Sequence, residues 1–264
     1  MPPAAVPMPE HRPRIVLMMA GGPLGWIIAN GLAARLGGLT VIQETPEDRR
    51  TILARRARRV GRLATAGQVA FGLLERLLRR RRQPRIAEIL ATHGLKSAPD
   101  PALTVHRVPS VNAAETHALL ARLAPAVVAV YGTRVLTRAT LAAVEAPFIN
   151  YHAGITPHYR GQHPSYWALA RGDVDNAGCT IHLVDAGVDT GAVLYQTRVT
   201  FDPADTISSY QVLQAAHALP LLARAIEDAL GGRLAPRAVR GDTPHWFPPT
   251  IWTYLYNGLA RGVW

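Results

Sequence analysis

Short hydrophobic runs alternate with amphipathic stretches along most of the chain. The runs are continuous, which is typical of strands buried on both faces of a sheet. They cover residues 14–20, 39–43, 104–108 and 126–131. Apolar residues at helical spacing separate them, at about 24–36, 113–123 and 134–144. Strands and helices that alternate in this order predict an α/β protein with a doubly wound, mostly parallel sheet flanked by helices.

The second half of the chain continues this pattern. Phe148 and Ile149 lead into a loop that carries Asn150. Pro164 suits the first turn of a helix that runs to about residue 171, with Gln162 or His163 near its cap. Two strands around a turn, a long helix and an aromatic tail complete the expected elements, at 179–184, 192–200, 205–230 and 244–264.

The segment 45–95 is expected to be a basic helical insert, because its apolar residues recur every three or four positions. Gly61, Gly67 and Gly72 should weaken or kink it. Its residues 49–82, the arginine-rich segment, hold twelve arginines and one acidic residue, Glu75. The simplest interpretation is a helical pair that packs on the sheet and keeps a solvated arginine face. An anionic partner (nucleic acid or a carrier protein) and an anionic membrane surface are the alternatives.

The N-terminus needs a separate interpretation. Residues 1–12 contain four prolines and are expected to form a disordered leader. Arg12 and Arg14 precede an apolar run that resembles a signal peptide or membrane anchor. However, glycines and a proline interrupt the run at 21–25, whereas a spanning helix needs about twenty unbroken apolar residues. A strand, a loop and a helix are therefore the better prediction, and we expect no transmembrane segment.

Composition narrows the class of protein. The chain has 264 residues, of which 48% are hydrophobic, so it can form one large α/β domain, alone or with an appendage. A single cysteine, Cys179, excludes an internal disulfide framework and a cysteine-rich zinc site. It also favours a reducing, cytoplasmic location. The net charge of +11 comes from the arginine-rich segment, because the rest of the chain carries 17 basic and 17 acidic residues and is therefore neutral.

Three side chains could catalyse acyl transfer to an amine without a metal. Asn150 could donate its amide N–H to the oxyanion that forms on the attacked carbonyl, an interaction worth about 3–4 kcal/mol. His152 could shuttle protons, because the pKa of imidazole lies near neutral pH. Asp189 could orient the histidine and favour its cation, or accept a proton through water. Alternatively, His152 is a hydrogen-bonded loop residue and Asp189 a turn former.

The motifs around these residues resemble those of the formyltransferase family, which includes glycinamide ribonucleotide, methionyl-tRNA and amino-sugar formyltransferases. The resemblance is dense from about Val105 to Gln196. It rests on Asn150-Tyr-His-Ala-Gly-Ile-Thr-Pro157, Tyr159-Arg-Gly161, Pro164, Trp167-Ala168, Gly172-Asp173, Gly178-Cys-Thr-Ile-His182 and Asp185-Ala-Gly-Val-Asp-Thr-Gly191. It implies a Rossmann-like domain, 10-formyltetrahydrofolate as the formyl donor, and Asn150, His152 and Asp189 as the catalytic residues.

The same resemblance implies where the folate binds. Segment 131–136 is similar to the one whose backbone contacts the pterin, and segment 184–188 to the loop on the pterin's other side. The expected folate contacts are Arg134, Val135, Leu136, Val184, Asp185 and Gly187. Core packing is an equally good explanation for Val135 and Leu136. His158, Arg160 and His163 flank the catalytic loop and are candidates for binding the acceptor.

Two departures from the family bear on the acceptor. The loop Gly21-Gly-Pro-Leu-Gly25 lacks the hydroxyl and amide side chains with which the ribonucleotide enzymes hold a phosphate, although backbone N–H groups there could still bind an anion. The methionyl-tRNA enzymes carry a C-terminal β-barrel, for which residues 231–264 are too short and too aromatic. We expect a formyltransferase-like domain at 13–230 and an aromatic extension at 231–264, which closes the acceptor pocket, packs internally or forms a homodimer contact.

These observations favour an N-formyltransferase that acts on a primary amine of a small or carrier-borne acceptor. A nucleotide-linked amino sugar would suit the arginine excess. A formyltetrahydrofolate hydrolase, or a repurposed acyl hydrolase on the same fold, is the first alternative. The second is a nucleic-acid or membrane-surface binding protein that acts through the arginine-rich segment, which intact Asn150, His152 and Asp189 disfavour.

Overall fold

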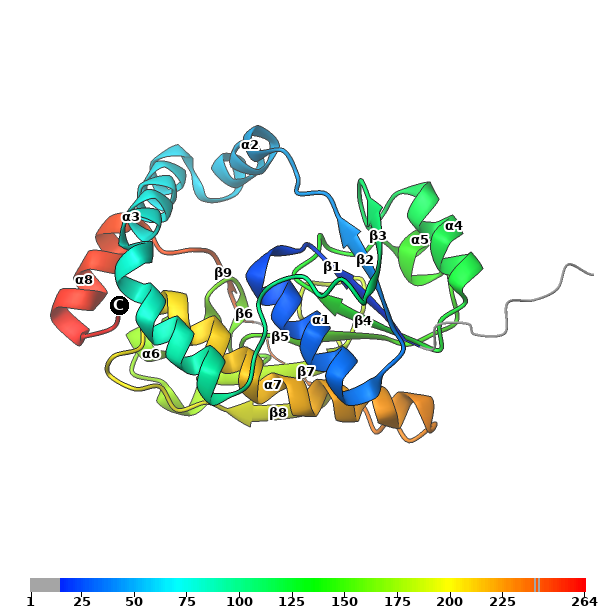
Figure 1. Cartoon of the computed structure of the whole chain (residues 1–264). Helices are drawn as coiled ribbons and strands as arrows, with labels where there is room; N and C mark the ends of the chain where they lie inside the picture. The colour runs from blue at the N-terminus through cyan, green and yellow to red at the C-terminus, as the bar shows by residue number, and fades with distance from the viewer. Residues whose placement is uncertain (1–14, 240, 242) are drawn as a thin grey trace, which may run out of the picture.

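A seven-stranded sheet forms the centre of the molecule in the computed structural model (Figure 1), which describes residues 15–264 except 240 and 242. The predicted leader, 1–12, lies outside these residues. The strand order is β3-β2-β1-β4-β5-β7-β8. The first five strands in sequence are parallel: β1 (Ile15–Met19), β2 (Leu39–Glu44), β3 (Thr104–Val108), β4 (Val127–Tyr131) and β5 (Phe148–His152). The last two, β7 (Gly178–Leu183) and β8 (Val193–Arg198), run antiparallel to their neighbours, so the mostly parallel α/β prediction is confirmed.

Helices cover both faces of the sheet because successive strand residues point to opposite sides. Leu17 and Met19 of β1 lie in one hydrophobic cluster with α1 (Gly22–Leu36) and α7 (Ile207–Leu230). Val16 and Met18 lie in a second cluster with α4 (Ala114–Leu123) on the other face. The continuous apolar runs of the sequence therefore correspond to strands buried on both sides, as expected.

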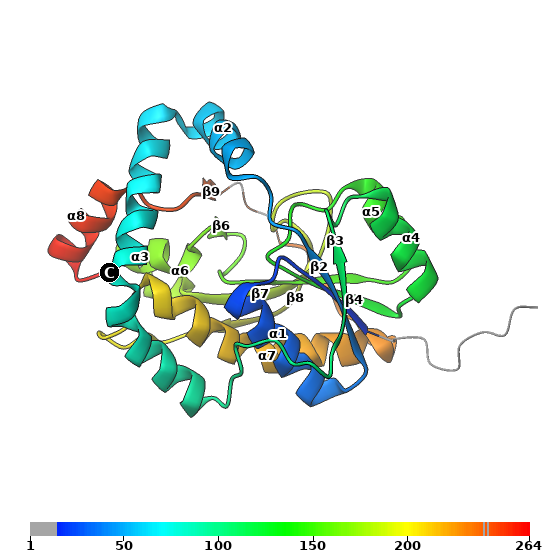
Figure 2. The ribbon, with the colours of Figure 1, turned by 45° about the horizontal axis from the view of Figure 1, so that its top comes forward.

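The predicted basic insert forms two helices, α2 (Arg49–Val60) and α3 (Arg62–Thr92), which meet at Gly61, where φ is +89°. The prediction that they pack on the sheet is wrong for most of their length. Helix α3 lies against α7 and α8 (Ile251–Arg261), and it reaches the main core only near its end, through Ile89. Helix α2 buries none of its residues and stands away from the sheet (Figure 2).

Two further local predictions need correction. The helix expected at 134–144 is limited to α5 (Arg138–Leu141). Residues 134–137 of the expected helix form a loop instead, because the Asn112 side chain donates to the carbonyl of Val135 and accepts from the N–H of Thr137. Asn150 and His152 lie on β5 and not on a loop, because β5 continues along β7 as far as residue 152.

The remaining elements surround the end of β5. Helix α6 (Pro164–Ala170) starts after His163, whose side chain does not cap it, and a 3-10 turn, η1 (Val174–Asn176), follows. A two-stranded parallel sheet joins β6 (Arg160–Gly161) to β9 (His245–Trp246). Through β9 the aromatic tail pairs with the segment that follows β5. Within the described residues, no helix is long and apolar enough to span a bilayer.

Candidate active site

The pairing of β5 with β7 brings four polar residues onto one face of the sheet. Asn150 lies opposite His182, and His152 lies opposite Thr180. Because alternate residues of a strand share a face, Asn150 and His152 project to the same side. The Asn150 amide nitrogen, Nδ2, is 3.0 Å from Nε2 of His182. His182 Nδ1 is 2.7 Å from the Leu183 carbonyl, so Nδ1–H donates there and Nε2 accepts from Asn150.

Asp189 reaches the same point from the loop between β7 and β8. Its backbone has a φ of +53°, in the left-handed region that few residues other than glycine adopt. Its Oδ2 is 3.4 Å from Nδ1 of His152, and its Oδ1 is 3.7 Å from Nε2 of His182. The backbone N–H of Gly161 donates to Oδ2 at 3.1 Å. The structure thus brings together Asn150, His152 and Asp189.

The orientation of the His152 ring is fixed from its other side. Nε2 is 2.8 Å from the carbonyl oxygen of Tyr159 and donates its proton there. Gly154 permits this arrangement, because a β-carbon at that position would come 2.7 Å from Nε2 and 2.6 Å from the Tyr159 oxygen. Nδ1, which faces Asp189, is therefore the nitrogen that is free to take up a proton.

Electrostatics favour a neutral imidazole beside an ionised carboxylate. Burial lowers the pKa of His152, and the charge of Asp189 and the Tyr159 carbonyl only partly oppose this. Burial alone would raise the pKa of Asp189, but the two imidazoles and the Gly161 N–H outweigh it and hold that pKa well below its usual range. When His152 takes up a proton, Asp189 is already charged and stabilises the cation.

His182 belongs to one of the motifs that carry the family resemblance, but the sequence predicts no role for it at the site. It is buried and contacts both Asn150 and Asp189, so it positions the two groups relative to each other. The sequence carried one signal for it. In the run 178–183 the polar residues Thr180 and His182 alternate, which places them on the same face. Their partners on β5 could be identified only from the strand register.

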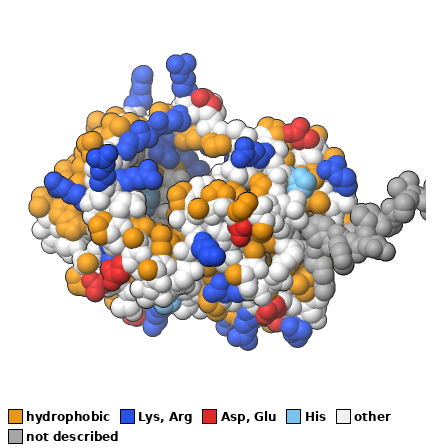
Figure 3. Space-filling view, viewed as in Figure 1, with side chains coloured by type: hydrophobic (Ala, Val, Ile, Leu, Met, Phe, Trp, Pro, Cys, Tyr) orange, Lys and Arg blue, Asp and Glu red, His pale blue; other side chains and the backbone are white. Residues whose placement is uncertain are grey.

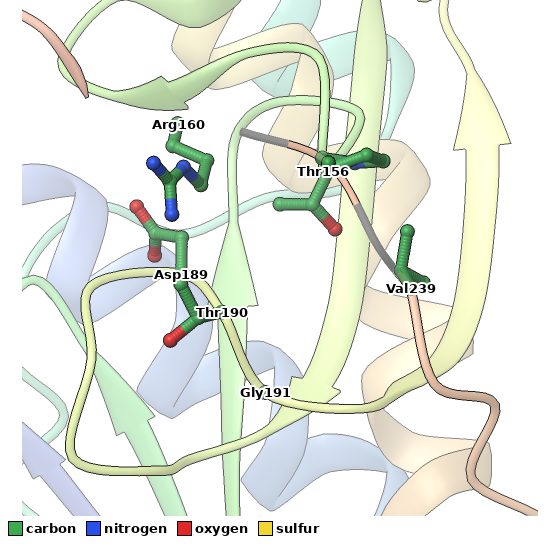
Figure 4. Close-up of a pocket in the computed structure, with 8 residues that line it drawn as sticks. Thr156, Arg160, Asp189, Thr190, Gly191 and Val239 are labelled. Carbon is green, nitrogen blue, oxygen red and sulfur yellow. The ribbon is translucent and has the colours of Figure 1, made fainter. Parts of the chain in front are cut away.

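A small open pocket adjoins Asp189 (Figure 4). Among the predicted acceptor residues, Arg160 lines this pocket, and its guanidinium points toward the Asp189 carboxylate. Arg160 also donates from Nη2 to the Thr243 carbonyl at 2.6 Å. His158 is exposed and does not line the pocket, and His163 lies outside it, with its ring 6.2 Å from that of Phe71.

Comparison with known proteins shows the family to which this chain belongs. The sequence profile described as formyl transferase matches residues 78–225, more than half of the chain. The chain belongs to the formyl transferase family. The family resemblance drawn from the sequence motifs is thereby confirmed.

Relatives of this formyl transferase family member include methionyl-tRNA formyltransferases. The protein from Pelotomaculum thermopropionicum is 34% identical over 138 residues, which cover 52% of this chain and 43% of the relative. The protein from Aromatoleum aromaticum is 33% identical over 165 residues, which cover 58% of this chain and 52% of the relative. The chain therefore spans about half the length of these curated relatives.

Solved structures of the family share the fold. Glycinamide ribonucleotide transformylase 1 from Symbiobacterium toebii superposes with a TM-score of 0.53 at 21% identity, over 87% of this chain and 92% of that one. The N-formyltransferase from Helicobacter canadensis, in complex with folinic acid and dTDP-3-aminofucose, gives a TM-score of 0.54 at 11% identity, over 88% and 70%. At these identities the likeness concerns the fold alone.

The two segments expected to hold the folate contribute to the same hydrophobic cluster in this family member. Leu136 is buried in the second hydrophobic cluster, and Val184 packs against the same cluster. Val135 is exposed. Asp185 closes its own loop by accepting hydrogen bonds from the Gly187 N–H at 3.0 Å and the Thr190 hydroxyl at 2.7 Å.

Arg134 is the predicted folate contact whose side chain is most fully engaged elsewhere. Its guanidinium lies 2.9 Å from the buried Glu44 carboxylate and donates to the carbonyls of Pro109 and Thr45. Its backbone N–H also donates to Glu44. A contact from Arg134 to a folate would therefore come from its backbone carbonyl. Within the described residues, no cluster of three or more His, Cys, Asp or Glu side chains is arranged to hold a metal.

Proposed function

We propose that this protein transfers a formyl group from 10-formyltetrahydrofolate to a primary amine. The observation that carries the proposal is the convergence of Asn150, His152 and Asp189 at the end of β5, in a member of the formyl transferase family. We place the folate between segments 131–136 and 184–188, as the family resemblance implies. Leu136 and Val184 contribute to one hydrophobic cluster, so apolar side chains from both segments lie in the same part of the fold.

His152 Nδ1 takes the proton of the attacking amine. The new bond joins the amine nitrogen to the formyl carbon, and the carbonyl oxygen becomes an oxyanion. Asn150 has two N–H groups, of which one bonds His182 and the second is available to the oxyanion. The protonated His152, paired with Asp189, returns its proton to the departing folate nitrogen as the oxyanion collapses. Products are the formamide and tetrahydrofolate.

The acceptor that we propose carries phosphate, as a nucleotide-linked amino sugar does. Two arginines of α2 point to the rim of the site. Nη2 of Arg56 is 3.4 Å from the side-chain oxygen of Gln162, which follows Gly161, the residue whose N–H donates to Asp189. The Arg59 guanidinium lies 5.3 Å from the centre of the Phe247 ring. Neither forms an ion pair within the described residues.

The surroundings of these arginines support an anionic ligand. Burial and the charge of Arg56 lower the pKa of His163 to about 4, which leaves that imidazole neutral. The surface is hollowed beneath α2, with basic side chains around the hollow (Figure 3). One solved neighbour binds dTDP-3-aminofucose, an amino sugar on a nucleotide diphosphate. Unpaired, partly dehydrated guanidinium groups are good phosphate ligands.

Mass spectrometry of candidate amines incubated with 10-formyltetrahydrofolate tests the function. Wild type should add one formyl group to a phosphate-bearing amine. His152→Ala and Asp189→Asn should each reduce the rate by about 10²–10⁴, the usual contribution of general acid–base catalysis. His106→Ala, on the distant edge strand β3, is the matched control and should retain full activity.

The same assay measures free formate. Release of formate without any formylated amine would contradict the transferase proposal and support hydrolysis. Equal product from wild type, His152→Ala and Asp189→Asn would remove these side chains from the mechanism.

A further inference from the structure

The large exposed hydrophobic side chains of this protein gather on two helices. Eight of the ten such side chains among the described residues lie on α3 and α8. Leu63 and Leu77 of α3 are 76% and 80% exposed, and Leu259 of α8 is 80% exposed. The full set on the two helices is Leu63, Val69, Leu73, Leu77, Trp252, Leu255, Tyr256 and Leu259. We call it the apolar face.

The two helices that carry the apolar face are in contact with each other. On α8 the exposed residues occupy positions i, i+3, i+4 and i+7 from Trp252, which is one side of a helix. The two helices pack against each other, and Trp252 lies directly on Gly67, where a β-carbon would overlap its indole ring. Figure 1 shows α8 alongside α3 at one end of the molecule, and Figure 3 shows apolar and basic side chains interspersed there.

Exposed arginines of α3 surround this face: Arg62, Arg76, Arg79, Arg80 and Arg81. Acidic charge is scarce beside them. Glu75 turns inward and pairs with Arg82 at 2.5 Å, and α8 has no acidic residue. Arg261 extends the basic border on α8, with its guanidinium 5.6 Å above the Tyr256 ring.

We propose that the apolar face binds the surface of an anionic membrane, with α3 and α8 lying in the plane of the headgroups. Leucine, tryptophan and tyrosine on one side and arginine beside them are the composition of helices that rest in this interface. Tryptophan and tyrosine suit the headgroup level, because each has an apolar ring and a polar edge. The arginines are then placed to contact lipid phosphates.

A second copy of the chain and a nucleic acid both fit the apolar face less well than a membrane does. A second copy docked symmetrically would bring the arginines of α3 close to those of its partner, and like charges oppose that contact. A nucleic acid would satisfy the arginines but would leave the exposed leucines without an apolar partner. An anionic bilayer satisfies both groups at once.

The inner side of α3 connects this face to the candidate active site. Gln68 donates to the Pro248 carbonyl at 3.0 Å, and Phe71 lies against His163. A membrane on the outer side would therefore lie about one helix diameter, roughly 10 Å, from the rim of the site. The membrane inference stands on the exposed residues and does not depend on formyl transfer.

Co-sedimentation of the full chain with vesicles tests the proposal. Binding to vesicles that contain phosphatidylglycerol should be at least about tenfold tighter than binding to phosphatidylcholine alone, and it should weaken as salt rises. The variant Leu73→Ser/Leu77→Ser should lower affinity by about tenfold or more, because it removes apolar contact area. The variant Arg76→Gln/Arg79→Gln/Arg80→Gln should lose the preference for anionic vesicles.

Val174→Ser is the matched control, since Val174 is also exposed but lies on η1 and on neither of the two helices. It should bind like wild type. Circular dichroism melting of each variant checks that the fold is kept. Failure of wild type to bind either vesicle overturns the proposal. Undiminished binding by the double leucine variant also overturns it and leaves a purely electrostatic contact with polyanions.

Discussion

His152 has one nitrogen fixed as a donor and one that faces a carboxylate. The Tyr159 carbonyl accepts from Nε2 at 2.8 Å, while Nδ1 is 3.4 Å from Asp189. A neutral ring with the proton on Nε2 is the form that accepts a proton from an attacking amine. The choice of tautomer is thus made by a backbone carbonyl seven residues away, and Gly154 provides the space for that contact.

The pKa of His152 tests this arrangement of charges. Burial lowers it below 6.5, and Asp189 raises it in part, so wild type should titrate below 6.5. Asp189→Asn removes the opposing charge and should lower the pKa further. NMR titration of the His152 ring in both proteins gives the two values. A wild-type pKa above 6.5, or a higher pKa in the variant, would contradict the proposed balance of burial and charge.

At the scale of elements, the strands were predicted well because continuous apolar runs identify them directly. The helix at 134–144 was predicted too long, since Asn112 and Glu44 hold its first residues in a loop through contacts distant in sequence. His182 was missed for a similar reason. Its role depends on the register of β5 with β7, which a single sequence does not specify. Asn150, His152 and Asp189 could be named as candidates from the sequence because they lie in dense, family-like motifs.

The packing partner of α3 could not be predicted from the spacing of its apolar residues. That spacing identifies the side of the helix that is buried but not the element that covers it. Arg85 of α3 helps to fix the partner, because its guanidinium donates two hydrogen bonds, of 2.9 and 3.1 Å, to Asp205, which lies just before α7. Asp205 is almost fully buried. Burial alone would raise its pKa, but the hydrogen bonds from Arg85, the Asp202 N–H and Ser209 lower it.

Replacing Arg85 should therefore destabilise the junction of α3 with α7. Arg85→Met leaves a buried carboxylate without its cation and should cost about 3–5 kcal/mol at pH 7. A carboxylate with a lowered pKa contributes stability that is present above pH 3.8 and is lost as pH falls. The difference between variant and wild type should then shrink below about pH 4.

Urea unfolding at several pH values measures this difference. Arg79→Met, an exposed position on the same helix, is the control and should change stability by less than about 0.5 kcal/mol. A loss for Arg85→Met that is equally small, or that does not depend on pH, would show that the ion pair does not secure α3.

In the whole molecule, α2 and α3 form a strongly basic helical arch on one side of a nearly neutral α/β sheet domain. The sheet domain holds the candidate catalytic residues at the end of β5, and the arch places arginines over the rim of that site. The outer side of the same arch, with α8, presents the apolar face. In our proposals the sheet domain carries out the chemistry, and the helices α2, α3 and α8 bind the acceptor and the membrane.

A crystal structure with bound 5-formyltetrahydrofolate tests the central claim most directly. We predict that the pterin lies between segments 131–136 and 184–188, with N10 of the folate facing Asn150 and His152. Asp189 should keep its contact with Nδ1 of His152 in that complex. A pterin bound elsewhere, or one whose N10 faces away from these side chains, would contradict the account.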